Sequence, residues 1–257
     1  MSFYSSDYLT KAREKVKAIS NSGTLPEPVS TTHPKYSGTV TESAFTTCVI
    51  DADTISAAIN EHKQNPSEYI GVLNFASYKY PGGGYVTGAM AQEECLCYDT
   101  NLYYELCKYE PEYEMRRLDL NNGLYRNKGI YSRGISVIAS RPGIFLAPED
   151  RFVIDVFTCA APNLNYMIRQ NKADSREVID TIYSRADYVI QSMAQYPCDT
   201  LILGAFGCGV FRNDASIVAK AFKKALESCK VHGFKKVIFA IPGNSTTNYI
   251  KFKNVFG

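Results

Sequence analysis

Three consecutive glycines, Gly82, Gly83 and Gly84, follow a short apolar run and precede two adjacent carboxylates, Glu93 and Glu94. A run of glycines costs backbone entropy and supplies no packing, so it occurs where another backbone or a ligand comes close. The glycines follow a strand-like segment and precede a helix-like one, so their N–H groups and a helix N-terminus would face one cleft. The pattern predicts a strand, a ligand-binding turn and a helix.

This turn differs from the two common nucleotide-binding turns. No Lys-Ser or Lys-Thr pair follows the glycines, which excludes a P-loop, and three other residues separate Gly84 from Gly88, which excludes a dinucleotide fingerprint. If the next segment is helical, Glu93 and Glu94 lie about 100° apart around it. We therefore expect the two carboxylates to have different roles.

Composition and charge limit the class of protein. The chain has 257 residues, of which 45% are hydrophobic, so it can form one large α/β domain or two small ones. The net charge is +2 with scattered basic residues, so we expect no duplex nucleic acid or membrane partner. The first residues lack a signal-peptide pattern, and no apolar run approaches about 18 residues. We expect a soluble, cytoplasmic monomer.

Cysteine and histidine usage gives no indication of a metal site or a histidine-based mechanism. The eight cysteines include no C-x-x-C pair, so we interpret them as reduced core thiols. His33, His62 and His232 are the only histidines, and none stands beside a potential ligand or nucleophile. We expect no metal and no cofactor.

Apolar periodicity predicts an alternation of strands and helices. Helices are expected at 7–19, 54–62, 91–108, 174–194, 215–231 and 246–252, and strands at 45–50, 69–76, 135–139, 152–157, 201–206 and 236–241. Residues 21–38 are expected to form a surface loop, and 109–133 an irregular segment. The alternation implies a mixed, mostly parallel sheet with helices on both faces. We divide the chain into an N-terminal helix and loop extension (1–44) and an α/β domain (45–257).

A second glycine-bearing turn comprises Gly207, Cys208, Gly209, Val210 and Phe211 and leads into an amphipathic helix. Because ligands of open α/β sheets bind outside the carboxyl ends of the strands, both glycine turns should border one crevice. A small buried cysteine suits a tight turn, so we do not interpret Cys208 as a reactive thiol.

Several short motifs together resemble the microbial poly(ADP-ribose) glycohydrolase type of macrodomain. They are Asn74-Phe75-Ala76-Ser77, Pro81-Gly82-Gly83-Gly84, Gln92-Glu93-Glu94 and Gly204-Ala205-Phe206-Gly207-Cys208-Gly209-Val210-Phe211. The most specific part is the triple glycine separated by seven residues from Gln-Glu-Glu. The resemblance runs from about Cys48 to the C-terminus.

The resemblance implies a macrodomain fold that binds ADP-ribose, with the diphosphate between the two glycine-rich loops, 82–84 and 207–211. It implies that Glu94 is the catalytic acid/base and that Glu93 contacts the ribose whose bond is cut. Asn74 and Gln92 would also contact the ligand.

Two further expectations come from the same resemblance. Phe211 would pack on the ribose whose bond is cut. Tyr80 stands where the family commonly has asparagine, so a polar contact to that ribose would be missing.

The chemistry of such a site can be argued from the residues. Cleavage of an O-glycosidic bond to ribose needs a proton on the leaving oxygen and a water at C1, and one carboxylic acid can serve both steps. We therefore predict release of ADP-ribose from (poly)ADP-ribosylated proteins, with ADP-ribose and these proteins as partners. The alternatives are a non-catalytic ADP-ribose reader and an esterase acting on O-acetylated ADP-ribose, which would not require Glu94.

Overall fold

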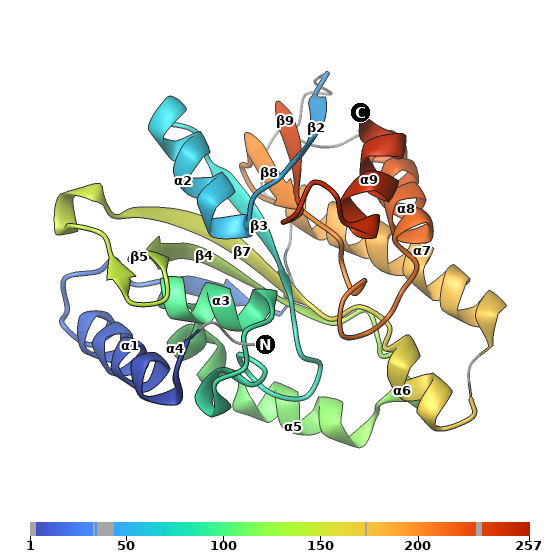
Figure 1. Ribbon diagram of the computed structural model, residues 1–257, viewed down its shortest axis with the longest axis horizontal. Coiled ribbons are helices and arrows are strands. Elements are labelled where there is room, and N and C mark those ends of the chain that lie inside the picture. The colour runs from blue at the N-terminus through green and yellow to red at the C-terminus, as the bar shows by residue number, and fades with distance from the viewer. Residues whose placement is uncertain (1–3, 33, 35–43, 173, 230–232) are drawn as a thin grey trace.

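A mixed β-sheet forms the centre of the protein (Figure 1). The computed structural model describes residues 4–32, 34, 44–172, 174–229 and 233–257. Within them, seven strands pair in the order β1-β4-β7-β3-β8-β9-β2. Their bounds are β1 Val29–Thr31, β2 Thr46–Ile50, β3 Ile70–Phe75, β4 Gly129–Val137, β7 Phe152–Cys159, β8 Thr200–Leu203 and β9 Lys236–Ala240, and β5 Ala139–Arg141 and β6 Ile144–Phe145 form a separate hairpin.

Most neighbouring strands run parallel. β2, β9, β8, β3 and β7 form a parallel set, whereas β4 is antiparallel to β7 and β1 is antiparallel to β4. The predicted mixed, mostly parallel α/β architecture is therefore confirmed. Because the carboxyl ends of the parallel strands lie along one edge, the segments that follow them meet there.

Helices cover both faces of the sheet (Figure 1). Their bounds are α1 Ser6–Ser20, α2 Thr54–Gln64, α3 Gln92–Asp99, α4 Leu102–Cys107, α5 Glu110–Leu118, α6 Leu164–Arg169, α7 Ser175–Met193, α8 Ala215–Ser228 and α9 Thr247–Phe256. None of these described helices is long and apolar enough to cross a bilayer.

Alternate residues of β3 supply the two cores. Leu73 belongs to the cluster that includes Val189 of α7 and Phe222 of α8. Val72, one residue earlier, belongs to the cluster that includes Ile55 of α2 and Leu102 of α4. Both faces of this strand are buried, which explains its continuous apolar sequence.

The predicted helix at 91–108 is wrong in one respect, because it is two helices, α3 and α4. Thr100 is extended and forms an isolated bridge with Val137, and the Asn101 side chain accepts a hydrogen bond from Ser136 N at 2.9 Å. These contacts with β4 replace the helical hydrogen bonds at the junction. The break redirects the chain after the first turns of α3, which carry the carboxylate pair.

Two segments predicted to lack regular structure contain some. Residues 109–133 include α5 and the first part of β4, and the predicted loop at 21–38 includes β1. In α5 only Tyr113 and Arg116 are buried and five of its nine residues are charged, so the helix offers few apolar positions from which to predict it. Other parts of the predicted elements, at 33, 35–38 and 230–231, lie outside the described residues. The short helix α6 was not predicted.

The N-terminal helix packs against the segment that carries the glycines and carboxylates. Leu9 and Ala12 of α1 share a cluster with Tyr85, Cys97 and Tyr98. The chain division at residue 44 stays a prediction, but α1 lies against the elements that form the candidate site.

Candidate active site

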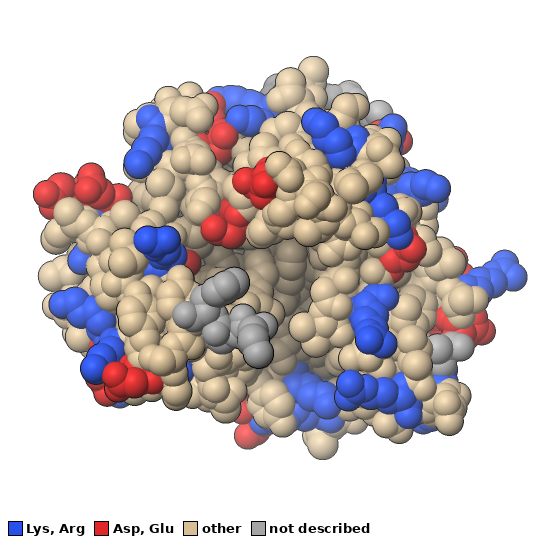
Figure 2. Space-filling view, viewed as in Figure 1, with Lys and Arg blue, Asp and Glu red and all other residues tan. Residues whose placement is uncertain are grey.

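A cavity of about 1040 Å³ opens at the carboxyl ends of the parallel strands. The face of the molecule seen in Figure 2 is hollowed near its centre. The cavity is lined by residues that follow β3, β8 and β9 and by the first turns of α3. Its volume suits a ligand of nucleotide size. Gly83 and Gly84 of the first glycine turn and Gly207 and Gly209 of the second both border it, as the sequence predicts.

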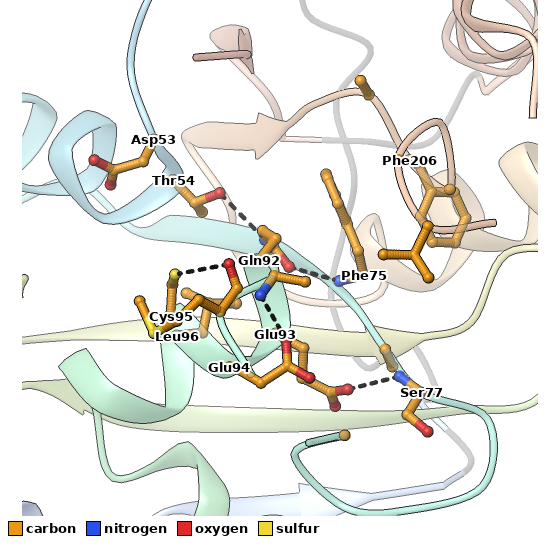
Figure 3. A pocket seen from close by; sticks show the side chains of 18 of the residues that line it. Asp53, Thr54, Phe75, Ser77, Gln92, Glu93, Glu94, Cys95, Leu96 and Phe206 are labelled. Atoms are coloured by element: carbon orange, nitrogen blue, oxygen red, sulfur yellow. Dashed lines mark hydrogen bonds between the residues drawn. The ribbon is translucent and has the colours of Figure 1, made fainter. Parts of the chain in front are cut away.

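Glu93 is held by groups at the end of β3. Its side chain is 2% exposed, and its Oε2 accepts a hydrogen bond from Ser77 N at 2.6 Å (Figure 3). Its Oε1 accepts one from Asn74 Nδ2 at 3.3 Å. Asn74 is completely buried and is not among the described residues that line the cavity, so it orients Glu93 from within the core.

Glu94 has a separate set of partners. Its Oε1 accepts a hydrogen bond from Gly84 N at 2.8 Å, and its Oε2 accepts one from Ala91 N at 2.9 Å, at the start of α3. The second bond is the capping interaction of a glutamate at the third helical position. The two adjacent carboxylates are thus fixed independently, and Glu94, 7% exposed, is the more accessible one.

The glycine turn packs directly on this carboxylate pair. Gly83 has a φ of +57°, and a Cβ at this position would lie 2.6 Å from Glu94 Oε1 and 2.9 Å from Glu93 Oε2. Such distances are too short for a real side chain, so the carboxylates require glycine here.

The sequence predicts that the N–H groups of Gly83 and Gly84 are free to bind phosphate. In the structure both are already hydrogen-bonded within the protein. Gly83 N donates to Tyr80 O at 3.1 Å, and Gly84 N donates to Glu94 Oε1. A buried carboxylate needs donors, and the nearest ones are the amides of the turn. The first glycine turn therefore positions carboxylates.

The environment of Glu93 favours its protonated form. Burial away from water raises the pKa of Glu93 to about 8, and the charge of Glu94 acts in the same direction. The hydrogen bonds from Ser77 N and Asn74 lower the pKa but do not offset the burial. Glu93 therefore retains its proton at neutral pH.

This raised pKa predicts a pH-dependent stability. A carboxyl with a folded pKa of about 8, against an ordinary 4.5, stabilises the fold fully below pH 4.5. That contribution declines as the pH rises and is lost above about 8. We expect the melting temperature of the wild type to fall relative to that of Glu93→Gln between pH 5 and pH 9. Thermal unfolding at several pH values measures this difference.

The exposed Glu149 provides the control for this measurement. The Glu149→Gln variant should follow the wild type across the same pH range. Parallel curves for Glu93→Gln and the wild type would show that Glu93 titrates at its ordinary pKa.

The second glycine turn leaves several amides available. Gly207 has a φ of +71°, and Asn213 closes the turn by donating its N–H to Gly207 O at 3.1 Å and its side-chain amide to Pro162 O at 2.9 Å. In the part of the chain that the structure describes, no protein acceptor is found for the N–H groups of Gly207, Gly209, Val210 and Phe211. Backbone N–H groups arranged in such a turn can bind an anion.

The N-terminus of the following helix is already occupied. The Asp214 side chain accepts hydrogen bonds from Ser216 N at 2.7 Å and Ile217 N at 3.4 Å. The amides available to an anion at this end of the cavity are therefore those of the turn.

Gln92 connects α3 to the end of β3. Its Oε1 accepts a hydrogen bond from Phe75 N at 2.8 Å, and its Nε2 donates to Leu73 O at 2.9 Å and to Thr54 Oγ1 at 3.2 Å (Figure 3). Gln92 borders the cavity, but its amide is engaged within the protein. Like Asn74, it has the geometry of a positioning residue.

The remaining predicted residues differ in their access to the cavity. Phe211 and Val210 line it, and the Phe211 ring lies edge-on to Tyr125, with centroids 6.3 Å apart. Gly82 and Cys208 are not among the described residues that line it. Burial raises the pKa of Cys208 to about 12, so its thiol stays protonated at neutral pH.

Among the described residues, no histidine lines this cavity. His62 lies in the last turn of α2 and stacks on Phe152, with ring centroids 4.1 Å apart. His33 and His232 lie outside the described residues. Within the described ranges, no group of three or more His, Cys, Asp or Glu side chains could hold a metal ion.

Sequence reasoning missed several residues of the cavity wall. Tyr125 and Tyr166 border the cavity, and Tyr125 stacks on Tyr78 with ring centroids 4.2 Å apart. Ser77 contributes its N–H to Glu93. Tyr125 and Tyr166 come from segments without a periodic pattern, so only the tertiary structure brings them to the site.

The structure combines a mixed α/β fold with a buried carboxylate pair at a nucleotide-sized cavity, an arrangement suited to the hydrolysis of glycosidic bonds. The sequence profile of the microbial-type PARG catalytic domain, where PARG is poly(ADP-ribose) glycohydrolase, matches residues 4–140, more than half of the chain. The chain therefore belongs to the microbial-type PARG family, and the predicted family and enzyme class are confirmed.

Solved structures agree with this assignment. PARG from Thermomonospora curvata is 28% identical with a TM-score of 0.75, and the match covers 98% of this chain and 89% of that one. The same enzyme bound to the inhibitor ADP-HPD is 26% identical with a TM-score of 0.71, covering 97% and 88%. PARG from Deinococcus radiodurans in complex with ADP-ribose is 28% identical with a TM-score of 0.69, covering 98% and 92%. No curated protein matches the chain by sequence.

Proposed function

We propose that this protein hydrolyses the O-glycosidic ribose linkage of ADP-ribosylated proteins and ADP-ribose chains and releases ADP-ribose. The observation that carries the proposal is the pair of independently held, buried carboxylates facing a nucleotide-sized cavity. The complex of the Deinococcus radiodurans enzyme with ADP-ribose supports the choice of ligand.

The two ends of the cavity suit different parts of ADP-ribose. The amides of residues 207 and 209–211 would bind the diphosphate, because they are the backbone donors left without a protein acceptor among the described residues. Glu93 would hold the ribose whose bond is cut, and Phe211 would pack on that ribose.

We assign Glu94 as the acid/base. The carboxyl transfers a proton to the leaving oxygen as the bond from C1 to that oxygen breaks; a water then attacks C1 and returns a proton to the carboxylate. A bound diphosphate adds negative charge beside the carboxyl, which favours its protonated form. Glu93 is assigned to hold the ribose and Glu94 to transfer the proton. A phosphate oxygen of the ligand would therefore hold the water.

Release of free ADP-ribose tests the proposal. The wild-type protein is incubated with protein that carries ADP-ribose chains and, separately, with singly modified protein, and we expect release from chains. If neither substrate released ADP-ribose but calorimetry still showed that the protein binds ADP-ribose, the protein would be a non-catalytic reader. Activity only on O-acetylated ADP-ribose would indicate an esterase.

A further inference from the structure

Tyr80 is an exposed aromatic side chain on the rim of the cavity. It is 54% exposed and lines the cavity next to the carboxylates. Its carbonyl oxygen accepts the hydrogen bond from Gly83 N at 3.1 Å, and Gly83 packs against both Glu93 and Glu94. The Tyr80 ring is therefore part of the turn that packs on Glu93 and Glu94.

Arg117 of α5 supports this ring from behind. Its guanidinium carbon lies 5.5 Å from the centre of the Tyr80 ring, within cation–π range. Arg117 Nη1 donates to Lys79 O at 2.9 Å, and Nη2 pairs with Glu110 at 2.8 Å. The guanidinium is thus fixed against the rim of the cavity and leaves part of the ring open to solvent.

Lys79 adds a second cation to the same rim. Its Nζ lies 5.6 Å from the centre of the Tyr166 ring, and both residues line the cavity. Among the ion pairs of the described residues, none involves Lys79, whereas Arg117 pairs with Glu110 at 2.8 Å and with Glu114 at 3.9 Å. An exposed ring and the cation of Lys79 therefore lie on the rim of the cavity.

We propose that Tyr80, supported by Arg117, forms with Lys79 a subsite for the leaving unit of an ADP-ribose chain. The inference rests on the proposed function, which puts the scissile bond at Glu94 and one ADP-ribose unit inside the cavity. The leaving group then extends over the rim. In a chain it is another ADP-ribose unit, which has a purine to stack on Tyr80 and a diphosphate to attract Lys79.

A singly modified protein offers a different leaving group. The amino-acid side chain that leaves has neither a purine ring nor a diphosphate, so it gains little from an exposed ring and the cation of Lys79. The subsite therefore favours cleavage within ADP-ribose chains over removal of single units.

The test compares Tyr80→Ala and Tyr80→Phe with a matched control. Tyr69 is 57% exposed and precedes β3, at the opposite end of this strand from the cavity, so Tyr69→Ala removes an equally exposed ring away from the site. For each variant, kcat and KM are measured on ADP-ribose chains and on singly modified protein.

We expect Tyr80→Ala to raise KM for chains roughly tenfold, because a stacked base contributes a factor of this order. The ratio of kcat/KM for chains to that for single units should fall by about the same factor. Tyr80→Phe should retain most of the ratio, and Tyr69→Ala should keep the wild-type ratio. An equal loss on both substrates, or no loss with Tyr80→Ala, would overturn the subsite.

A binding measurement separates this inference from the proposed function. In protein carrying Glu94→Gln, adding Tyr80→Ala should weaken binding of an ADP-ribose dimer roughly tenfold more than binding of ADP-ribose itself. Equal effects on the two ligands would contradict the subsite whether or not the protein turns over. Absence of turnover in the wild type, with the dimer effect present, would contradict only the proposed function.

Discussion

Glu94→Gln should reduce the release of ADP-ribose by roughly a thousandfold while ADP-ribose binding changes only a few-fold. Glutamine has nearly the same shape as glutamate but cannot transfer the proton that the leaving oxygen requires. It can still accept one of the two hydrogen bonds that Gly84 N and Ala91 N donate to Glu94. Single-turnover kinetics on ADP-ribose chains measure the first effect, and calorimetry with ADP-ribose measures the second.

Glu93→Gln is the matched control for this experiment. Glu93 is assigned to hold the ribose, so its replacement should act mainly on KM and leave a larger residual kcat than Glu94→Gln. If Glu94→Gln turned over at the wild-type rate while Glu93→Gln did not, the roles of the two carboxylates would have to be exchanged. That exchange would fit the proton that Glu93 retains at neutral pH.

Gly83→Ala should lower both stability and activity. The backbone at Gly83 has a φ of +57°, which costs a non-glycine residue about 1 to 2 kcal/mol. In addition, the new Cβ would displace one or both carboxylates, and a shift of about 1 Å can reduce activity about a hundredfold. Thermal unfolding and release of ADP-ribose from chains measure the two effects.

Gly23→Ala separates backbone strain from the contact with the carboxylates. Gly23 has a φ of +70°, but a Cβ there would meet nothing within 4 Å. This variant should lose a similar amount of stability through strain and keep its activity. If Gly83→Ala were as active as Gly23→Ala, the packing of the turn on the carboxylate pair would not matter for catalysis.

Local patterns made much of the fold predictable. The order of strand, glycine turn and helix around Glu93 and Glu94 follows from apolar spacing and the glycines, as does the second turn before α8. The break between α3 and α4 could not be predicted in the same way. It depends on contacts of Thr100 and Asn101 with Val137 and Ser136, which lie far along the chain.

At the site, the two glycine turns also differ in a way that the sequence could not predict. Their sequences predict the same task, but the first turn uses its Gly84 amide to hold Glu94, whereas the second leaves amides without a protein acceptor among the described residues. Which acceptor takes a backbone N–H depends on the tertiary structure. The contact of Arg117 with Tyr80 could not be predicted either, since α5 is mostly charged and buries only Tyr113 and Arg116.

A crystal structure of the Glu94→Gln variant with ADP-ribose tests the account most directly, because the variant should bind the ligand without cleaving a chain. We predict that the diphosphate oxygens lie about 2.7 to 3.2 Å from the amide nitrogens of residues 207 and 209–211. The terminal ribose should lie beside Glu93, with its C1 facing position 94. A ligand bound in the reverse direction, or outside this cavity, would contradict the assignment of both the diphosphate site and the catalytic pair.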